Sequence, residues 1–370
     1  MFLKKLIMAN FRNYGNLNFE PSEMINVLYG FNAQGKTNLL EAIYCLATGH
    51  SHRSKDVDLI HWGEPYSKLK GIIKRGSEDT ELEVSFETGG QKNLKVDGIK
   101  QTRQPDYLGN LSVVLFSPED LSIIKGGPKE RRRFLDVEIS QISRSYAYLL
   151  LQYYKVLGQR NTLLKSFRTS AFNNIQLEIW DEQLVELGSK ILKKRFEMVR
   201  KLSSLGKNKH LQITAGKESL EIKYYCSLQV KPDFTIAEIG ANYSVKLKEI
   251  RQEELNRGST LVGPHRDDLV FYINGIDGRV FGSQGQQRTT ALSLKLAELE
   301  LIYGETREYP VLLLDDVLSE LDNLRRHYLL AAVKQKIQTF VTTTNLEYID
   351  QQLLTDAKVF RVDEGKLIYN

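Results

Sequence analysis

The chain has 370 residues, 41% of them hydrophobic and 26% charged, a composition typical of a globular protein with room for two or three domains. No run of about 18 apolar residues occurs, which excludes a helical membrane span. We expect no signal peptide, because Asn10 and Arg12 interrupt the short apolar stretch after Met1. The cysteines, Cys45 and Cys226, both lie in apolar surroundings, so we expect small core residues in a reducing, cytoplasmic compartment.

The net charge of +5 is unevenly distributed along the chain. Between Lys129 and His210 there are 17 Lys and Arg against 8 Asp and Glu, a net of +9, which leaves −4 for the rest. Such a positive segment suits a polyanion as a partner. A solvated helical arm rich in Lys and Arg explains the same charge equally well.

The first 30 residues predict strands and hairpins, because apolar residues alternate with polar ones from Leu3 to Leu28. A glycine-rich loop follows, and then residues 36–47 predict a helix with one apolar face. Further short strands are expected between residues 68 and 116.

Near residue 129 the apolar spacing becomes helical. Apolar residues three or four positions apart predict a helix from Ile139 onward, a second over 177–205 and a third that begins near Ile236 and ends near Gly258. Residues 211–230 look extended, so this middle lobe is expected to be mostly but not wholly helical.

After Gly258 the pattern of alternating strands and helices returns. We expect a hairpin around Asn274-Gly275, a helix over residues 286–303 and a strand over 311–314. A last helix and a strand over residues 339–342 complete an α/β arrangement.

Residues 30–37, with the sequence GFNAQGKT, match the P-loop pattern G-x-x-x-x-G-K-[ST] without a mismatch. The segment follows a predicted strand and opens a predicted helix, a context in which backbone N–H groups face phosphate oxygens. Lys36 is expected to reach the β- and γ-phosphates of ATP, and the Thr37 hydroxyl to bind Mg²⁺.

A second pattern is the apolar strand 311–314 that ends in Asp315 and Asp316. In a Walker B arrangement Asp315 would hold Mg²⁺, directly or through water, and Asp316 would orient or deprotonate the attacking water. Acidic residues end many α/β strands, so this pattern depends on the P-loop for its meaning.

A third pattern is SQGQQR at 283–288, which precedes a long amphipathic helix. Ser283 and Gln286 fit a capping box, which alone explains their spacing. A serine and a glycine at a helix N-terminus also suit a γ-phosphate, so the two interpretations are compatible.

Lys36 and Asp315 are 279 residues apart, a wide separation for the two Walker elements. It indicates a large insertion within one ATPase head. We therefore expect the head to consist of residues 1–128 and 258–370, with the basic, mostly helical lobe at 129–257.

Several segments resemble the RecF family of recombination mediators within the SMC-like ABC ATPases. They are NFRNY at 10–14, GFNAQGKTNLLEAIY from Gly30, FSPEDL at 116–121, KERRRFLD at 129–136, LVGPHRDDL at 261–269, SQGQQRT at 283–289 and LLLDDVLSELD at 312–322. These segments span nearly the whole chain, and the middle lobe is matched least. Unlike transporter ATPases, the chain has Gln284 in place of a signature glycine, Asp316 in place of glutamate, and threonines 342–344 in the switch region.

The resemblance implies an ABC-type P-loop head assembled from both chain ends, with an inserted helical arm, that dimerises on ATP binding. Ser283 and Gly285 of one subunit would close over the γ-phosphate held by the other, and Asp322 would lie at the seam. The catalytic set would be Lys36, Asp315, Asp316 and Ser283, with Thr37 and Asp315 as Mg²⁺ ligands. The nucleotide contacts would be Arg12, Asn13, Gly30, Phe31, Asn32, Ala33, Gln34, Gly35, Lys36, Thr37, Asn38, Ser283, Gly285 and Asp322.

The resemblance further implies a weak DNA-dependent ATPase that acts as a switch. It would bind DNA at gaps or single-strand/double-strand junctions and help load RecA, with RecO and RecR as partners, in DNA repair, replication and the SOS response. Arg131, Arg132 and Arg133 either contact DNA phosphates or coat a helix start, and the basic lobe favours the first. The FSPEDL segment lacks the Q-loop glutamine, which leaves Glu119 and Ser117 as candidates there.

Other residues carry weaker signals. His265 and Arg266 suit either a function near the dimer surface or plain turn chemistry. Trp62 and Trp180 are expected to pack in the core or arm, and the few His and Cys residues form no metal-ligand pattern.

Two other classes of protein share some of these motifs. An ABC-type ATPase that drives a membrane partner is disfavoured by the large insertion and the missing switch histidine. An ATPase fused to a nuclease would need an added acidic domain, and only 25 residues follow Asn345.

Overall fold

The computed structural model describes residues 1–167, 174–333, 336–349 and 354–369. The chain forms two compact units: Met1–Asp120 with Leu292–Asn370, which we call the head, and Leu121–Ala291, which we call the arm. The head therefore contains both chain ends. Residues 121–128 and 258–291, which the sequence pattern grouped with the head, belong by their contacts to the arm.

The head contains a six-stranded antiparallel sheet with the order β2-β1-β4-β5-β6-β7. Side chains of β4 alternate between buried and partly exposed, because one face of this sheet packs on the core and the other meets solvent. Its strands are β1 (Phe2–Phe11), β2 (Tyr14–Phe19), β4 (Tyr66–Arg75), β5 (Glu78–Glu87), β6 (Lys92–Val96) and β7 (Ile99–Gln101).

The second head sheet has the order β15-β14-β3-β13-β12-β8 and is parallel except for β15. Since β13 pairs with both β3 and β12, the strand before the P-loop and the strand before Asp316 end at the same edge of the sheet. The strands are β3 (Ile25–Tyr29), β8 (Val113–Phe116), β12 (Val311–Asp315), β13 (Thr339–Thr343), β14 (Ala357–Asp363) and β15 (Lys366–Tyr369).

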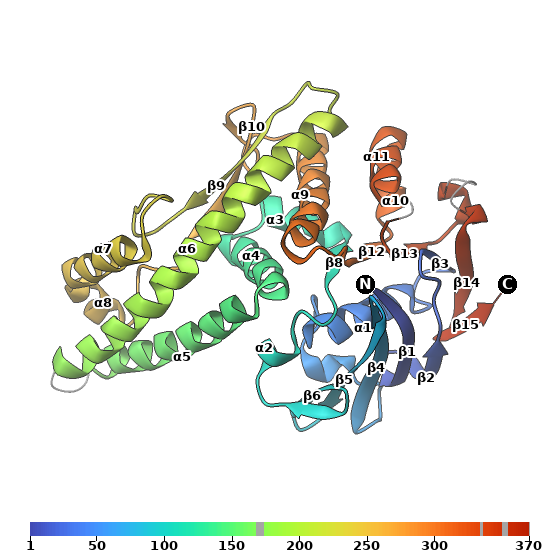
Figure 1. Ribbon diagram of the computed structural model, residues 1–370, viewed down its shortest axis with the longest axis horizontal. Helices are drawn as coiled ribbons and strands as arrows, with labels where there is room; N and C mark the ends of the chain where they lie inside the picture. The colour runs from blue at the N-terminus through green and yellow to red at the C-terminus, as the bar shows by residue number, and fades with distance from the viewer. Residues whose placement is uncertain (168–173, 334–335, 350–353, 370) are drawn as a thin grey trace. The chain divides into compact units, whose positions relative to one another are not determined.

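Helix α1 (Lys36–Thr48) lies between the two head sheets and contacts strands of both (Figure 1). This position explains why nearly every side chain of α1 is buried rather than only one face. The other helices of the head are α2 (Gln104–Tyr107), α10 (Val317–Glu320) and α11 (Asn323–Val333), with single turns of 3₁₀-helix at Asp56–Leu59, Pro118–Asp120 and Leu346–Tyr348. Helix α9 (Gln284–Thr306) begins in the arm and ends in the head.

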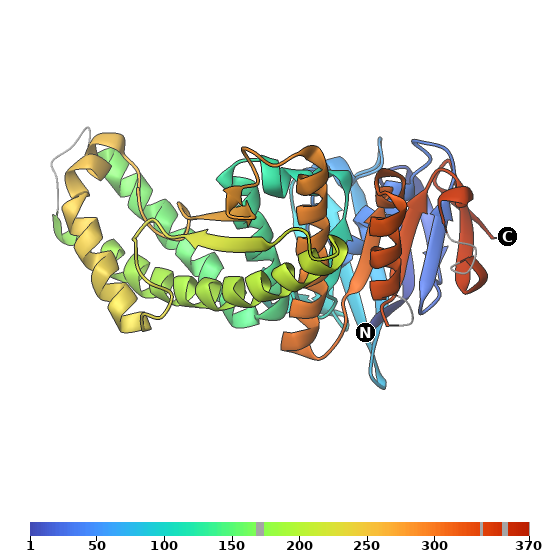
Figure 2. The same ribbon diagram turned by 90° about the horizontal axis from the view of Figure 1, so that it is seen from above.

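The arm is built on two long helices, α5 (Arg144–Ser166) and α6 (Asn174–Ile213), which lie side by side in both views (Figures 1 and 2). Two shorter helices, α3 (Leu121–Lys125) and α4 (Pro128–Ile142), precede them. The helical pattern from Ile139 is thus divided between α4 and α5, because the Ser143 hydroxyl accepts a hydrogen bond from Tyr146 N and caps α5.

The remaining arm elements are two helices and a three-stranded sheet of order β11-β10-β9. The third expected helix is in fact two, α7 (Ile236–Glu249) and α8 (Arg251–Arg257), because Ile250 leaves the helical conformation. The sheet consists of β9 (Leu220–Tyr225), β10 (Asp268–Ile273) and β11 (Ile276–Asp277), and β9 packs on α6. The expected hairpin is present, and both Asn274 and Gly275 have the positive φ that its tight turn requires.

The arm interior holds fully buried arginines. Arg160 on α5 donates to Glu254 at 2.6 Å and to Asp181 at 2.7 Å. Arg195 on α6 donates to Asp136 at 2.6 Å and to the Pro264 carbonyl at 2.7 Å.

The loop between α8 and β10 collects hydrogen bonds from several arm elements. Its backbone accepts bonds from Tyr243 of α7 at Val262 and from Arg132 of α4 at Asp267, and Leu261 N donates to Glu254 of α8. The Tyr224 hydroxyl of β9 donates to the Asp267 carboxylate at 2.6 Å. The loop thus joins helices that are far apart in the sequence.

None of the helices that the structure describes is long and apolar enough to cross a membrane.

Candidate functional site

The loop between β3 and α1 has the curled backbone expected of a P-loop. Ala33 and Gly35 have positive φ values of 64° and 114°. A side chain at Gly35 would meet Asn13 Oδ1 at 2.8 Å, and one at Gly30 would overlap the Val362 carbonyl oxygen. Glycine is therefore required at both positions, for conformation and for space.

Two neighbouring side chains hold this loop in place. Asn13 Nδ2 donates to the Gln34 carbonyl at 3.0 Å, and the Tyr14 hydroxyl donates to the Gly35 carbonyl at 3.0 Å. The resemblance implies that Asn13 contacts nucleotide; in the structure its side chain binds the backbone of the loop. The Asn13 Oδ1 atom also accepts a bond from Asn38 at 2.8 Å.

The Lys36 ammonium folds back over the loop and donates to the carbonyls of Gly30 at 2.6 Å and Phe31 at 2.7 Å. Burial lowers the pKa of Lys36, and the nearby carboxylates of Asp316 and Asp315 oppose that change. A cation held above the N-terminus of α1 is placed to bind phosphate oxygens.

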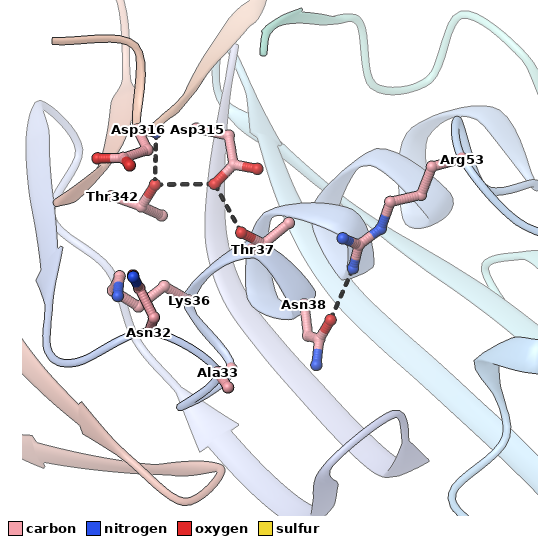
Figure 3. A pocket seen from close by; sticks show the side chains of 10 residues that line it. Asn32, Ala33, Lys36, Thr37, Asn38, Arg53, Asp315, Asp316 and Thr342 are labelled. Carbon is pink, nitrogen blue, oxygen red and sulfur yellow. Dashed lines mark hydrogen bonds between the residues drawn. The ribbon is translucent and has the colours of Figure 1, made fainter. Parts of the chain in front are cut away.

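Asp315, Thr37 and Thr342 form a chain of hydrogen bonds at the ends of three elements (Figure 3). Asp315 Oδ1 accepts bonds from the Thr37 hydroxyl at 2.8 Å and the Thr342 hydroxyl at 2.9 Å. The parallel register places Thr342 beside both Asp315 and Leu28, which explains how the end of β13 joins the Walker residues. The threonine in the switch region therefore binds the Walker B carboxylate directly.

Asp316 has features suited to a proton acceptor. Its backbone is left-handed, with φ 52°, and its N–H donates to the Thr342 hydroxyl at 2.9 Å. Its Oδ1 atom is buried without a hydrogen-bond partner. Burial raises the pKa of Asp316, the charge of Asp315 raises it further, and Ser319 and Lys36 oppose the rise.

These groups line a cavity of about 240 Å³ in the head. Its residues are Asn32, Ala33, Gly35, Lys36, Thr37, Asn38, Arg53, Asp315, Asp316 and Thr342 (Figure 3). The set fits a nucleotide phosphate with Mg²⁺: one lysine and a helix N-terminus for the anion, and the Thr37 and Asp315 oxygens for the cation. No group of three or more His, Cys, Asp or Glu that could hold a metal occurs among the described residues.

Arg53 lines this cavity, although no sequence motif indicated it. Its guanidinium donates to Asn38 Oδ1 at 2.7 Å and to Glu41 Oε2 at 2.8 Å. Arg12 binds the same Glu41 carboxylate through two nitrogens, at 2.8 and 2.9 Å, and does not line the cavity. Although burial opposes ionisation of Glu41, its bonds to Arg12, Arg53 and Ser51 hold its pKa at about 2.

The segment expected to carry the signature lies in the arm, whereas every residue that lines the cavity lies in the head. Ser283 N donates to Gln286 Oε1 at 2.9 Å, and Gln286 N donates to Ser283 Oγ at 3.2 Å, so the capping box is formed. Gly285 follows in the first turn of α9. In the head, Asp322 accepts a bond from Arg325 N at 2.8 Å at the start of α11.

The three arginines expected to contact DNA differ in exposure. Arg131 is 2% exposed and donates to both carboxylate oxygens of Asp268, at 2.6 and 2.8 Å. Arg132 donates to the Asp267 carbonyl at 2.8 Å, and Arg133 is exposed. Of the three, Arg133 is the most exposed, and Arg131 joins α4 to β10.

Three of the weaker sequence signals can now be placed. Glu119 and Ser117 do not line the cavity, and Ser117 N donates to Asp120, whose pKa burial raises to about 6. Trp62 is 96% exposed, so the prediction that it packs in the core is wrong, whereas Trp180 is partly buried in the arm. His265 is partly buried, and one of its ring nitrogens lies 2.7 Å from the Tyr153 hydroxyl.

Comparison with known proteins gives a consistent result. The family described as RecF/RecN/SMC N terminal domain matches residues 2–366. The chain is 48% identical over 367 residues to the DNA replication and repair protein RecF of Oceanobacillus iheyensis, covering 99% of each chain. It is also 48% identical to that of Bacillus mycoides, covering 99% of this chain and 98% of the relative.

Solved structures agree with this similarity. The recombination mediator protein RecF with ATP, described in the RecFOR pathway, is 40% identical with a TM-score of 0.93 and covers 100% of this chain and 97% of its own. The corresponding structure with ATPrS has a TM-score of 0.92 at 40% identity, and covers 100% and 98%. An Smc head bound to the C-winged helix domain of ScpA shares the fold, with a TM-score of 0.56 at 16% identity.

Proposed function

Because this chain belongs to the RecF family of DNA replication and repair proteins, we propose that it is an ATPase in which nucleotide joins two copies into a DNA-binding dimer. The main support for the proposal is that the motifs of one ATP site are divided between the head and the arm. The head cavity has the P-loop and Walker B residues, whereas Ser283 and Gly285 are residues of the arm that do not line it. A second chain is the natural source of the missing γ-phosphate ligands.

ATP is the nucleotide that we assign to the cavity, with Mg²⁺ as its counter-ion. The N–H groups at the start of α1 and the Lys36 ammonium would bind the β- and γ-phosphates. Thr37 and Asp315 would hold Mg²⁺, which neutralises phosphate charge when bound. The names of the two solved relatives, with ATP and ATPrS, support this assignment.

Hydrolysis would use Asp316 as the group that accepts a proton from the attacking water. Its raised pKa increases its basicity, and its Oδ1 has no hydrogen-bond donor that would compete for the proton. Thr342 cannot exchange protons as a switch histidine does, and its hydroxyl is already bonded to Asp315. We therefore expect slow hydrolysis that acts as a switch rather than rapid turnover.

The arm would supply the DNA surface. Of its 17 Lys and Arg between residues 129 and 210, Arg131, Arg160 and Arg195 are buried and bonded inside the arm. Exposed side chains, such as Lys129, Arg133 and Lys155, are better placed to meet phosphates. By likeness to relatives described in the RecFOR pathway, we place the chain with RecO and RecR at gaps or junctions, where it would help load RecA.

The test is sedimentation of the full chain with a non-hydrolysable ATP analogue, with and without a gapped duplex. We expect dimers only with the analogue, and tighter DNA binding by the dimer that weakens steeply with salt. Equal DNA affinity with and without nucleotide at one fixed salt concentration would contradict the gating.

A further inference from the structure

Large apolar side chains are exposed beside each motif that the proposed dimer places at its seam. Phe31 in the P-loop is 80% exposed, and Phe281, two residues before Ser283, is 74% exposed. Val280 is 59% exposed, and Leu324, two residues after Asp322, is 56% exposed.

Single exposed apolar residues are ordinary on protein surfaces and need no explanation. Their coincidence with three separate motifs is different, because those motifs come from distant parts of the sequence. A phenylalanine that remains in water beside a ligand site loses the free energy that its burial would contribute. A partner surface that covers these side chains would recover it.

The local geometry limits where two of these side chains would meet their partners. The Phe31 carbonyl lies 2.7 Å from the Lys36 ammonium, the group assigned to the β- and γ-phosphates. Phe281 and Ser283 are two positions apart, so their Cα atoms can be at most about 7 Å from each other. If Ser283 of one subunit meets the γ-phosphate bound by Lys36 of the other, Phe31 and the partner's Phe281 are close enough to touch.

We propose that Phe31 of one subunit packs against Val280 and Phe281 of a second copy of this chain, and so forms an apolar contact beside each composite ATP site. In a twofold dimer the contact occurs twice, because each subunit presents both surfaces. This inference rests on the proposed function and adds the residues that join the two chains.

The test is a charge exchange in the full chain: Phe31→Lys, Phe281→Glu and the double variant. Dimerisation is measured by sedimentation at analogue concentrations that saturate each protein. We expect each single change to raise the dimer dissociation constant at least about tenfold, and the double variant to return within about threefold of the original. Ile99→Glu, a matched change at an exposed apolar residue of β7 outside these motifs, should leave dimerisation unaltered.

A cross-link supplies a second measurement that does not depend on charge. A Phe31→Cys protein is mixed with a Phe281→Cys protein, both carrying Cys226→Ser, while the buried Cys45 is kept. With the analogue and an added oxidant we expect a disulfide between the two different chains. Absence of that disulfide in mixtures that dimerise would overturn the pairing.

The outcomes separate this inference from the function on which it rests. If the unaltered chain forms no dimer with the analogue, both fail. Another outcome is that the chain forms dimers that Ser283→Arg blocks, while the dissociation constant of the double charge variant rises by the combined effect of the two single changes. In that case the proposed dimer is supported and the Phe31–Phe281 pairing is wrong.

Discussion

The interior of the head and the interior of the arm are stabilised by different interactions. The core of the head is a continuous set of apolar side chains from two sheets and α1, and no arginine is buried among the head residues that the structure describes. The arm buries Arg131, Arg160 and Arg195, each bonded to a carboxylate. Both units contain buried carboxylates with ionic partners, such as Glu41 and Glu298 in the head, but only in the arm are the arginine partners themselves buried among the described residues.

The difference matters because the two kinds of interior respond differently to change. Apolar packing loses free energy in proportion to the atoms removed. A buried ionic network loses far more when one partner is deleted, since the other charge is left without compensation. The free energy of unfolding of the arm should therefore fall sharply when a single buried arginine is replaced by an uncharged residue.

The largest effect is expected for Arg160→Met in the arm. It leaves the fully buried Glu254 without its guanidinium partner, so the free energy of unfolding should fall by about 3–5 kcal/mol. Urea unfolding followed by Trp180 fluorescence in a Trp62→Phe background measures the arm. Adding Glu254→Gln should restore part of the loss; a loss below about 1 kcal/mol in the single variant would show that the network contributes little.

The next effect is expected in the head for Ile43→Ala in the centre of α1. Ile43 is fully buried between the sheets, so its truncation leaves a cavity and should cost about 3 kcal/mol. Hydrogen exchange of α1 and its flanking strands should report the change. If α5 and α6 lost protection equally, the two interiors would not be independent.

The stabilities of the two units should depend on pH in different ranges. Burial lowers the pKa of His265 to about 3, so the folded arm binds fewer protons than the unfolded chain between pH 6.5 and 3. Stability of the arm should therefore fall as the pH drops below 6.5, by about 2 kcal/mol at pH 5.

Glu41 in the head acts in the same direction but at lower pH. Its pKa of about 2 is depressed from 4.5, so its contribution is fully present above pH 4.5 and is lost only as the pH falls toward 2. Unfolding of the original chain and of His265→Gln between pH 7 and 5 tests the contrast. An unchanged pH slope in the variant would remove His265 as the cause.

The smallest effect is expected for Lys190→Ala on the solvent face of α6. Lys190 pairs with Glu186 at 2.7 Å, one helical turn away, and both side chains are exposed. Such pairs contribute about 0.3–0.5 kcal/mol. A loss above about 1 kcal/mol would mean that exposed charges also stabilise the arm, which would weaken the contrast with its interior.

The sequence predicted the parts of the fold that have a local pattern. Strand β3, the loop and α1 follow from apolar alternation, the glycines and Lys36, and β12 follows from an apolar run that ends in Asp315. The separation of 279 residues between the Walker elements predicted that both chain ends lie in one head. The structure confirms this prediction.

The remaining features depend on contacts between distant residues. Arg160 meets Thr260 across 100 residues, and nothing in the local sequence distinguishes a buried arginine from one on a basic surface. Arg53 lines the cavity only because Glu41 and Asn38 on the neighbouring helix orient it. The break at Ile250 also has no glycine or proline to signal it.

The central claim, that one chain completes the ATP site of another, is tested most directly by mixing two inactive variants. Lys36→Met lacks the phosphate ligand of the head, and Ser283→Arg lacks the arm residue, so neither alone should hydrolyse ATP. Their heterodimer would contain one intact composite site, so an equal mixture should recover about one quarter of the original ATPase rate if the variants pair at random, and about one half if neither pairs with itself. No recovery in a mixture that sedimentation shows to contain heterodimers, or normal hydrolysis by Ser283→Arg alone, would contradict the account.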